Sequence, residues 1–362
     1  MSDQCKTITV IVPTFERPSL LARALAAILA STYRALVVAV YDNASGPETE
    51  RVVRSFGKVD ERVRYHRHDT NIGGYANFAF GLARVETPYF AMLSDDDVPL
   101  VNFFETAMRG FESEPIAAFG AGATVEMTAG GKLVFAPQAF WPRGGRFSGI
   151  EGLALLLGGY HPSWNTMVFR TACMRNLGMP DLALQLVFDL EFTTRLAASY
   201  PFVVDLAPCG LFVRHETSST EYADSGVARD FDAFLARVAE RNDIESPLRT
   251  FILERVAILK TQRLEQVAVK QLVIGRPAVA REAIRAAVSA GARGVRPAAI
   301  ELFATVEGAL PLTRYAIAAL TNAWQRRRTE ASLRAIARGN VDYDLGGFRA
   351  ALSSSSAEAS IK

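Results

Sequence analysis

Three consecutive aspartates, Asp95, Asp96 and Asp97, follow the apolar segment Tyr89–Leu93. Adjacent carboxylates repel one another, so their clustering is unfavourable unless a cation compensates the charge. Mg²⁺ and Mn²⁺ prefer oxygen ligands and usually bridge a protein carboxylate to the phosphates of a substrate. The triplet therefore predicts a divalent-metal site. The alternative is a solvated acidic turn that caps the helix expected near Val101.

Polar residues also follow other apolar segments. The carboxylate of Asp42 can accept hydrogen bonds from a base or a ribose, although Asp-Asn-x-Ser more often forms an Asx-turn or a helix cap. The pair Gly73 and Gly74 lets backbone approach a ligand closely. Neither G-x-G-x-x-G nor a P-loop sequence occurs, which weighs against NAD enzymes and P-loop NTPases.

Two further groups of residues are candidates for catalysis or acceptor binding. Asp189 and Glu191 lie at the start of a predicted helix, where residues two apart diverge, so we expect only one of them to face a site. His215 follows an apolar strand and, taken alone, is more typical of a structural histidine. The loops containing Trp141 and Trp164 can stack on sugars, and packing of these side chains in the core is the equal alternative.

The first 120 residues alternate between two hydrophobic periods, which predicts a doubly wound, mostly parallel sheet flanked by helices. Ligands of such sheets bind outside the carboxyl ends of the strands. We expect strands at Thr7–Val12, Leu36–Tyr41, Val63–His66 and Tyr89–Leu93, helices at Ser19–Ser31, Glu48–Phe56 and Tyr75–Arg84, and polar strand ends at Pro13–Arg17, Asp42–Ser45, His66–Asn71 and Ser94–Asp97.

Strand patterns continue to about residue 214 and are then replaced by helical ones. A hairpin is expected within Ala117–Pro137, with its turn at Gly130-Gly131. We predict an α/β domain over residues 1–225, a basic all-α region over 226–350 and a disordered tail over 351–362. The other expected elements are strands at Thr166–Phe169, Phe202–Asp205 and Gly210–Arg214 and helices at Gly149–Leu157, Leu186–Ser199, Phe231–Asn242, Pro247–Ile274, Ala278–Ala290, Pro297–Leu310 and Arg314–Arg328.

Composition excludes several classes of protein. With 49% hydrophobic and 22% charged residues, the chain is neither disordered nor fibrous. A net charge of +2 gives no field that would attract nucleic acid, so we expect no nucleic-acid partner. The three cysteines, Cys5, Cys173 and Cys209, lack metal-binding spacing and fit a reducing cytoplasm. We find no signal peptide and no segment that would span a membrane.

Charge is distributed unevenly. Residues 1–225 carry a net charge of −5 and residues 226–352 one of +7. Within the basic part, Pro297–Trp324 is mostly apolar and is followed by Gln325 and three arginines, a pattern that predicts peripheral membrane contact through 297–328 at the inner face of the cytoplasmic membrane. The alternative is a soluble helical bundle or a homodimer interface with solvated arginines.

Taken together and in order, these segments resemble the inverting family 2 glycosyltransferases of the GT-A fold over about residues 7–220. Order and spacing carry the resemblance more than any single motif. The matching pieces are Val10–Arg17, Tyr41–Ser45, Asn71–Gly74, Leu93–Asp97, Phe188–Glu191 and Arg214-x-Glu216.

The resemblance implies a role for each piece. A nucleotide pocket would be formed by Pro13, Thr14, Glu16, Arg17, Asn71, Gly73 and Gly74, with Asp42 on the base and Asp95 near the ribose. The metal, Mn²⁺ or Mg²⁺, would be bound within the Asp95–Asp97 triplet, with His215 closing over it. Asp189, with Glu191 as the alternative, would deprotonate the acceptor hydroxyl. Phe188 and Ser94 depart from the family pattern, which leaves the base and the metal-binding aspartate open.

The implied activity is that of a hexosyltransferase which moves a sugar, with inversion, from a nucleotide-diphosphate donor to a hydroxyl group. We expect a UDP-sugar donor and a glycan or lipid-linked acceptor, as in polysaccharide or O-antigen assembly. Two alternatives are a sugar-1-phosphate nucleotidylyltransferase and a non-catalytic nucleotide-sugar-binding scaffold. A nucleotidylyltransferase should carry a glycine-rich loop after the first strand, and Pro13–Arg17 contains no glycine. A scaffold protein would not need the intact acidic triplet, so the presence of the triplet argues against this alternative.

Overall fold

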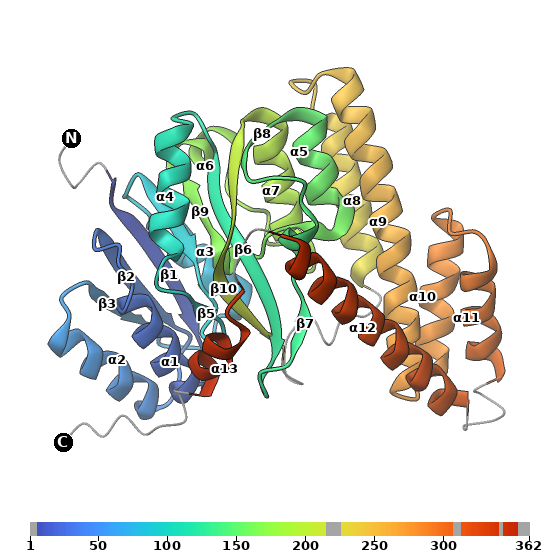
Figure 1. Cartoon of the computed structure of the whole chain (residues 1–362), viewed down its shortest axis with the longest axis horizontal. Helices are drawn as coiled ribbons and strands as arrows, with labels where there is room; N and C mark the ends of the chain where they lie inside the picture. Colours follow the sequence, from blue (N-terminus) through green and yellow to red (C-terminus); the bar gives the residue numbers. More distant parts are fainter. Residues whose placement is uncertain (1–5, 215–225, 307–312, 340–342, 354–362) are drawn as a thin grey trace. The chain divides into compact units, whose positions relative to one another are not determined.

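The computed structural model describes residues 6–214, 226–306, 313–339 and 343–353 (Figure 1). Two compact units make up the chain. The first unit comprises Met1–Leu182, Arg195–His215 and Ser332–Lys362, and the second comprises Ala183–Thr194 and Glu216–Ala331. The boundaries predicted after residues 225 and 350 stay a prediction.

A ten-stranded mixed sheet forms the centre of the first unit. Its strands are ordered β3-β2-β1-β4-β9-β6-β10-β5, with β7 paired to β6 and β8 paired to β10. This confirms the predicted α/β fold class with a mostly parallel sheet. The strands are β1 (Ile8–Thr14), β2 (Leu36–Asp42), β3 (Val63–Arg67), β4 (Tyr89–Met92), β5 (Val98–Pro99), β6 (Phe119–Thr128), β7 (Leu133–Phe135), β8 (Gly145–Phe147), β9 (Met167–Arg170) and β10 (Phe202–Arg214).

The four N-terminal strands run parallel to one another, and β1 lies between β2 and β4. We expected β1 to stop at Pro13, but it continues to Thr14, which pairs with Asp42 of β2. Pairing with β4 ends at Ile11 and Met92, so Pro13 lies beyond the last rung on that side. Proline is tolerated there because a missing N–H at the end of a ladder breaks no interior hydrogen bond.

Helices cover both faces of this parallel half. Alternate residues of β1 and β2, including Val10 and Val38, face a core shared with α1, α2 and α4. The opposite face packs on α3, where a Cβ at Gly81 would come within 2.8 Å of Ile11. The absence of a side chain at Gly81 thus allows α3 to lie close to β1. The helices are α1 (Pro18–Leu29), α2 (Pro47–Val59), α3 (Gly74–Leu82) and α4 (Phe103–Ser113).

The second half of the sheet departs from the prediction in detail. The expected hairpin is present, with β6 antiparallel to β7 around Gly131, whose φ is 76°. The two strands expected after residue 202 form the single strand β10, because register shifts between Val204 and Gly210 absorb the irregular segment without ending the pairing with β6. Shorter helical elements complete this half: η2 (Pro137–Phe140), α5 (Gly149–Leu155), η3 (Leu156–Tyr160), η4 (Trp164–Thr166), the unexpected α6 (Thr171–Leu177) and α7 (Phe188–Ser199).

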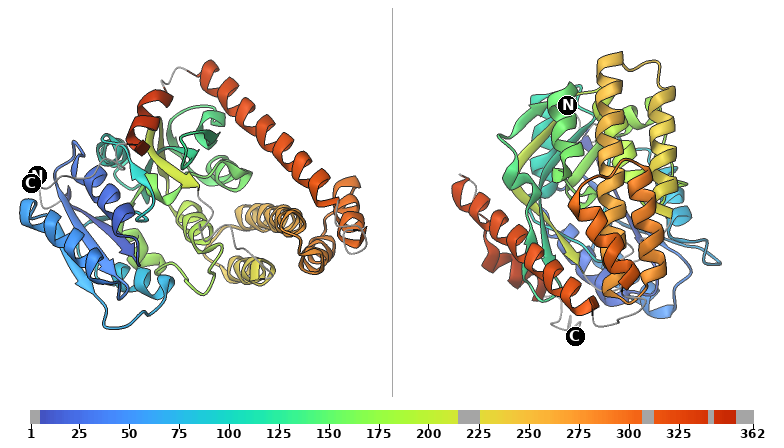
Figure 2. Two further views of the ribbon diagram at one scale, coloured as in Figure 1. Left: turned by 90° about the horizontal axis from the view of Figure 1, so that it is seen from below. Right: turned by 90° about the vertical axis from the view of Figure 1, so that its right-hand side faces the viewer.

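Helices account for the described part of the chain after residue 225. Within the second unit α8 packs on α9, α9 on α10 and α10 on α11, so the helices lie side by side and are seen nearly end-on in the left panel of Figure 2. This agrees with the predicted C-terminal helical region. Its helices are α8 (Gly226–Glu240), α9 (Ser246–Val273), α10 (Pro277–Ser289), α11 (Val295–Val306), α12 (Thr313–Arg338) and α13 (Leu345–Ser353).

The last helix, α13, belongs to the first unit and was not expected from the sequence. Phe348 and Leu352 are buried in a second core cluster with residues of β5, β6, β7 and β10. Arg349 donates a hydrogen bond of 3.1 Å to the carbonyl oxygen of Gly131 in the β6–β7 turn. The helix continues to Ser353, three residues into the tail predicted from 351. Among the described residues, no helix is long and apolar enough to cross a membrane.

Candidate active site

The carboxyl ends of the parallel strands meet at one edge of the sheet. β1 ends at Thr14, β2 at Asp42 and β3 at Arg67, and the acidic triplet follows the end of β4 at Met92. Parallel pairing in register brings these ends together. The expected gathering of polar residues at this edge is therefore present in the first unit.

The acidic triplet forms a turn between β4 and β5. The Asp97 N–H donates to the carbonyl oxygen of Ser94 over 3.3 Å, which closes the turn. Asp95 is 3% exposed, and its Oδ2 accepts a hydrogen bond of 2.7 Å from the hydroxyl of Thr14. Asp97 is 5% exposed and accepts from the backbone N–H of Val213 in β10 over 3.2 Å. Contacts from β1 and β10 thus fix two of the three carboxylates.

Two arginines compensate part of the negative charge of this turn. Nη1 of Arg17, the residue before α1, lies 3.3 Å from Oδ1 of Asp95 and 3.1 Å from Oδ2 of Asp96. Nη2 of Arg23, within α1, donates to the carbonyl oxygen of Asp96 over 2.6 Å. Buried Nε of Arg23 has no hydrogen-bond partner among the described residues. With all three carboxylates ionised, the two guanidinium groups leave the turn with one excess negative charge.

Burial controls the ionisation of the triplet. Loss of solvent around Asp95 raises its pKa to about 6, and the hydrogen bond from Thr14 opposes only part of this effect. Complete burial likewise raises the pKa of Asp97 well above its usual range, and the neighbouring Asp96 charge adds to the increase. Crowded carboxylates with raised pKa values are stabilised in their charged forms by a nearby cation.

The donor set fits a hard divalent cation. Among residues 6–214, 226–306, 313–339 and 343–353, no group of three or more His, Cys, Asp or Glu side chains is arranged to hold a metal ion. A cation of the Mg²⁺ type does not need such a cage, because it is commonly held by one or two carboxylates, with waters and substrate phosphates completing the shell. Of the three carboxylates, that of Asp96 is the most accessible, with its side chain 15% exposed.

The turn after β2 is held by its own polar groups. Asp42 is fully buried, and its Oδ1 accepts from the Ser45 N–H over 2.9 Å, as the Asx-turn alternative predicts. Its Oδ2 accepts from the hydroxyl of Tyr65 over 2.6 Å. Nε of Arg67 lies 3.8 Å from the same oxygen. Both oxygens of Asp42 are thus used within the protein.

The loops after β1 and β2 are joined by Glu16. Its backbone has a positive φ of 55°, which is uncommon for a residue other than glycine. The Glu16 N–H donates to Oγ of Ser45 over 2.9 Å, and Oε1 of Glu16 accepts from the N–H of Gly46 over 2.8 Å. These bonds hold the strained backbone in place. Glu16 therefore shapes the rim of the strand-end edge.

Asn71 orders the loop that leads into α3. Its Oδ1 accepts from Nδ2 of Asn43 over 2.7 Å and from the N–H of Gly73 over 2.9 Å. Gly73 has a φ of 89°, which only glycine adopts readily, and α3 begins at Gly74. A Cβ on either glycine would meet no atom within 4 Å, so open space lies above this backbone.

Comparison with known proteins identifies the first part of the chain. Residues 9–173 match the model of glycosyl transferase family 2. This segment is a family 2 glycosyltransferase domain. It contains the strand ends β1–β4 and the Asp95–Asp97 turn, so the predicted resemblance to the family is confirmed.

Similar sequences cover only part of this chain and of the relatives. The β-1,3-glucosyltransferase of Campylobacter jejuni named for GalNAc(5)-diNAcBac-PP-undecaprenol is 32% identical over 103 residues, 28% of this chain and 33% of that protein. The glucosyl-dolichyl phosphate glucuronosyltransferase of Haloferax volcanii is 27% identical over 136 residues, 37% of this chain and 43% of that protein. The chain thus spans less than half the length of these relatives.

Solved structures extend the likeness in fold beyond the family 2 domain. Residues 1–349 of TarS from S. aureus, in complex with UDP-GlcNAc, superpose with a TM-score of 0.58 at 13% identity, covering 82% of this chain and 90% of that chain. The mannosyltransferase PcManGT from Pyrobaculum calidifontis, in complex with GDP-Man and Mn²⁺, gives a TM-score of 0.54 at 16% identity, covering 91% and 85%. At these identities the likeness shows the fold alone.

The predicted catalytic residues lie outside the family 2 domain. Asp189 and Glu191 are in α7, in the part that belongs to the second compact unit. Oδ1 of Asp189 accepts from the N–H of Leu190 over 2.7 Å, whereas Glu191 is 4% exposed. The two side chains therefore differ in burial, as expected for positions two apart. His215 lies outside the described residues.

The two tryptophans predicted for acceptor binding pack in the interior instead. Trp141 is 5% exposed and donates from Nε1 to the carbonyl oxygen of Tyr160 over 2.9 Å. Trp164 is 6% exposed and packs edge-on against Phe78 and Phe169. The alternative reading of both side chains as core residues is the one that the fold supports.

Sequence patterns missed three polar residues of the strand-end edge. Arg23 donates a hydrogen bond to the carbonyl oxygen of Asp96, and the hydroxyl of Tyr65 donates to the carboxylate of Asp42. Arg67 donates to the carbonyl oxygen of Ser45. The alternation of β3 offered one signal, because Tyr65 shares a face with buried Val63. Arg23 gave no signal, since an arginine within a helix is most often solvated.

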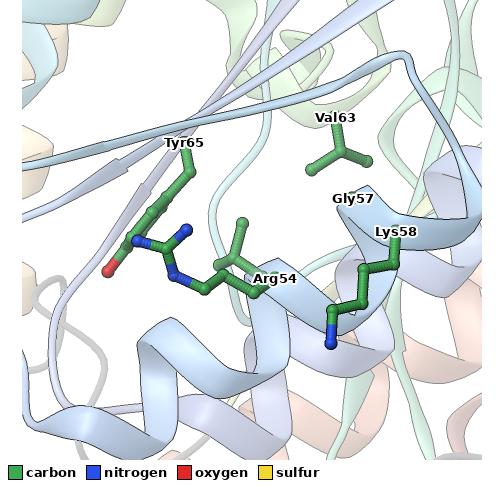
Figure 3. A pocket seen from close by; sticks show the side chains of 6 residues that line it. Arg54, Gly57, Lys58, Val63 and Tyr65 are labelled. Atoms are coloured by element: carbon green, nitrogen blue, oxygen red, sulfur yellow. The ribbon is translucent and has the colours of Figure 1, made fainter.

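A hollow of about 280 Å³ lies between α2 and the first half of β3 (Figure 3). Val53, Arg54, Gly57 and Lys58 line it from α2, and Val63 and Tyr65 from β3. The Tyr65 ring thus lies against the hollow, while its hydroxyl binds Asp42. None of the predicted nucleotide or metal residues of the family 2 domain lines this hollow.

Proposed function

We propose that the protein is a metal-dependent inverting glycosyltransferase that moves a hexose from a nucleotide-diphosphate donor to an acceptor hydroxyl. One observation carries the proposal: the buried Asp95–Asp97 turn lies at the carboxyl edge of the sheet, bonded to Thr14 of β1 and beside the guanidinium of Arg17. Membership of residues 9–173 in glycosyl transferase family 2 supports it.

Metal binding is assigned to the exposed side of the triplet. Asp96 would ligate Mn²⁺ or Mg²⁺, because its carboxylate is the most accessible of the three, with Asp97 as the second candidate. Bound there, the metal would neutralise charge that develops on the departing diphosphate. Thr14 fixes the orientation of Asp95, which the family resemblance assigns to the ribose. Arg17 supplies a further positive charge next to the position assigned to the diphosphate.

Catalysis needs a base on the acceptor side. Asp189 would accept the proton of the attacking hydroxyl, and Glu191 is the weaker candidate because it is 4% exposed. The acceptor oxygen attacks the anomeric carbon of the donor sugar as the nucleoside diphosphate leaves. This single displacement inverts the configuration at the anomeric carbon. No covalent intermediate with the protein is required.

A UDP-sugar is the favoured donor, and a glycan or lipid-linked glycan is the favoured acceptor. TarS was solved with UDP-GlcNAc and PcManGT with GDP-Man and Mn²⁺, so both nucleotide classes are worth testing. The names of the Campylobacter jejuni and Haloferax volcanii relatives contain undecaprenol and dolichyl phosphate. Lipid-linked acceptors of polysaccharide assembly are therefore the first to test.

Thermal melting with UDP, GDP, CMP or dTDP, each with and without Mn²⁺, tests the donor site. A nucleotide at about 100 times its dissociation constant should stabilise the protein by about 2.7 kcal/mol. We expect an Mn²⁺-dependent shift with one nucleotide, lost in Asp96→Ala and retained in the surface control Asp205→Ala. Absence of any shift with all four nucleotides would overturn the proposal.

A second experiment tests transfer itself. With the nucleotide-sugar selected by melting, the full-length protein should release the nucleoside diphosphate in the presence of a lipid-linked acceptor, and Asp189→Asn should lose this turnover while keeping the melting shift. Loss in Glu191→Gln instead would reassign the base. Release of pyrophosphate from a sugar 1-phosphate and a nucleoside triphosphate would point to a nucleotidylyltransferase.

A further inference from the structure

The helix α12 presents apolar and basic side chains together on one exposed face. Trp324 is 49% exposed and Leu320 is 63% exposed, four residues apart. Arg327, three residues after Trp324, is also exposed. Because helical positions three and four apart lie on the same face, these three side chains form one patch, called here the Trp324 patch.

Charge on this helix has one sign almost throughout. Over Thr313–Arg338 the sequence contains six arginines and one glutamate. The guanidinium of Arg328 lies 5.7 Å from the centroid of the Trp324 ring, so a cation also borders the patch from the next turn. Such a helix face is complementary to a surface of negative charge.

We propose that the Trp324 patch docks the protein on an anionic membrane surface. Basic side chains gain about 1 kcal/mol each next to anionic headgroups, and tryptophan favours the level of the headgroups, where its ring is half in apolar surroundings. Transfer of the exposed Leu320 side chain out of water is favourable only if an apolar phase lies beneath the charged headgroups. A nucleic acid offers phosphates without that phase, so the lipid surface fits the patch better.

This docking differs from the contact predicted over 297–328 as a whole. Within α11, Ile300 and Ala304 are buried in the second unit, whereas Leu302 is 62% exposed but has no exposed aromatic or cluster of arginines beside it. The proposal is therefore limited to a short stretch of α12, and among the described residues no helix is long and apolar enough to span a membrane. The proposal concerns peripheral attachment and does not rest on the transferase activity proposed above.

Tryptophan fluorescence provides a direct test, because Trp141 and Trp164 are buried and Trp324 is the exposed third of the three tryptophans. Vesicles of 30% phosphatidylglycerol in phosphatidylcholine should shift the emission of the full-length protein to the blue, and Trp324→Phe should abolish the shift. Pure phosphatidylcholine vesicles should cause none, and 0.5 M NaCl should reverse it. An equal shift with phosphatidylcholine would overturn the anionic preference.

Cosedimentation with the same vesicles separates the patch from general charge. We expect Arg327→Glu to weaken partitioning about tenfold and Leu320→Ser to weaken it several-fold. Matched controls are Arg326→Glu and Leu333→Ser, because both residues are exposed on the same helix but point away from Trp324. Equal losses in the controls would show that the face has no specific role and would overturn the proposal.

Two further outcomes are decisive. Binding to duplex DNA that is unaffected by Leu320→Ser, without binding to vesicles, would replace the membrane with a nucleic acid. Concentration-dependent dimerisation that Trp324→Ser abolishes, again without vesicle binding, would make the patch a contact between copies. In every variant the nucleotide-dependent melting shift should remain, so failure of docking and failure of the donor site give different results.

Discussion

The hydroxyl of Thr14 donates a hydrogen bond of 2.7 Å to Oδ2 of Asp95, and both residues are 3% exposed. Thr14 is the last residue of β1, and Asp95 lies in the turn after β4. This bond connects two strand ends that are 81 residues apart in the sequence. The orientation of the acidic turn therefore depends on a side chain of the first strand.

Replacing Thr14 with valine should destabilise the protein. The change keeps the shape of the side chain but removes the donor to a buried carboxylate, which costs about 2 kcal/mol for a bond to a charged group. Urea unfolding at pH 7.5 measures the effect. Thr9→Val is the control, since the Thr9 hydroxyl is bonded to the neutral hydroxyl of Thr87 over 2.7 Å. A loss in Thr9→Val as large as in Thr14→Val would contradict the role of charge.

Stability should depend on pH through Asp95. Its folded-state pKa is about 6, whereas an unfolded aspartate titrates near 3.8. Between these values the unfolded chain has released the proton and the folded protein retains it, so the free energy of unfolding falls as pH rises from about 4 to about 6 and changes little above. Urea unfolding across this range measures the slope.

Asp95→Asn should flatten part of that slope and leave the free protein more stable than the wild type at pH 7.5, by up to about 3 kcal/mol. The raised pKa of Asp97 accounts for a remaining slope. A variant that is less stable than the wild type at pH 7.5, with the wild-type slope retained, would show that burial does not control this carboxylate.

Arg17 should compete with a divalent cation. Its guanidinium contacts Asp95 and Asp96, so a metal on these carboxylates must share or displace that charge. Arg17→Ala should raise the affinity of the nucleotide-free protein for Mn²⁺ about fivefold, since a half-exposed ion pair is worth about 1 kcal/mol. Titration calorimetry measures it. Arg109→Ala, which breaks a surface pair with Asp205, should leave the affinity unchanged.

Tyr65→Phe should destabilise the turn after β2. The Tyr65 hydroxyl donates to Oδ2 of fully buried Asp42, and its removal leaves that oxygen with only the distant Arg67, at a cost of about 2 kcal/mol. Thermal and urea unfolding measure the loss. Tyr33→Phe removes a bond to the backbone oxygen of Lys6 and should cost less. Unchanged stability of Tyr65→Phe would mean that Asp42 has another donor.

Phe348→Ala should destabilise the first unit although the residue lies near the end of the chain. Its side chain is 7% exposed within the core cluster of β5, β6, β7 and β10, and truncation of a buried phenylalanine costs about 3 kcal/mol. Differential scanning calorimetry would show a lower melting temperature. Leu333→Ala is the control, because Leu333 is 42% exposed. Equal melting temperatures for Phe348→Ala and the wild type would contradict the packing of α13.

Local sequence patterns predict only those elements whose signals are local. Alternating and helical periods give β1–β4 and α1–α3 to within a few residues, because each of these elements buries a regular set of its own side chains. By contrast, α13 buries Phe348 and Leu352 against β5, β6, β7 and β10, which lie much earlier in the chain. The sequence of Leu345–Ser353 does not by itself indicate that these strands are its packing partners.

The same distinction applies to the site. The type and order of Asp95, Asp96 and Asp97, and their place after an apolar strand, are properties of the sequence, and together with the other strand-end segments they predict a family 2 domain. Which carboxylate is buried, which is bound by Thr14 and which is accessible depends on atoms from β1, α1 and β10. Tertiary structure alone decided these points, because burial and hydrogen bonding between strand ends arise only when the sheet brings distant segments together.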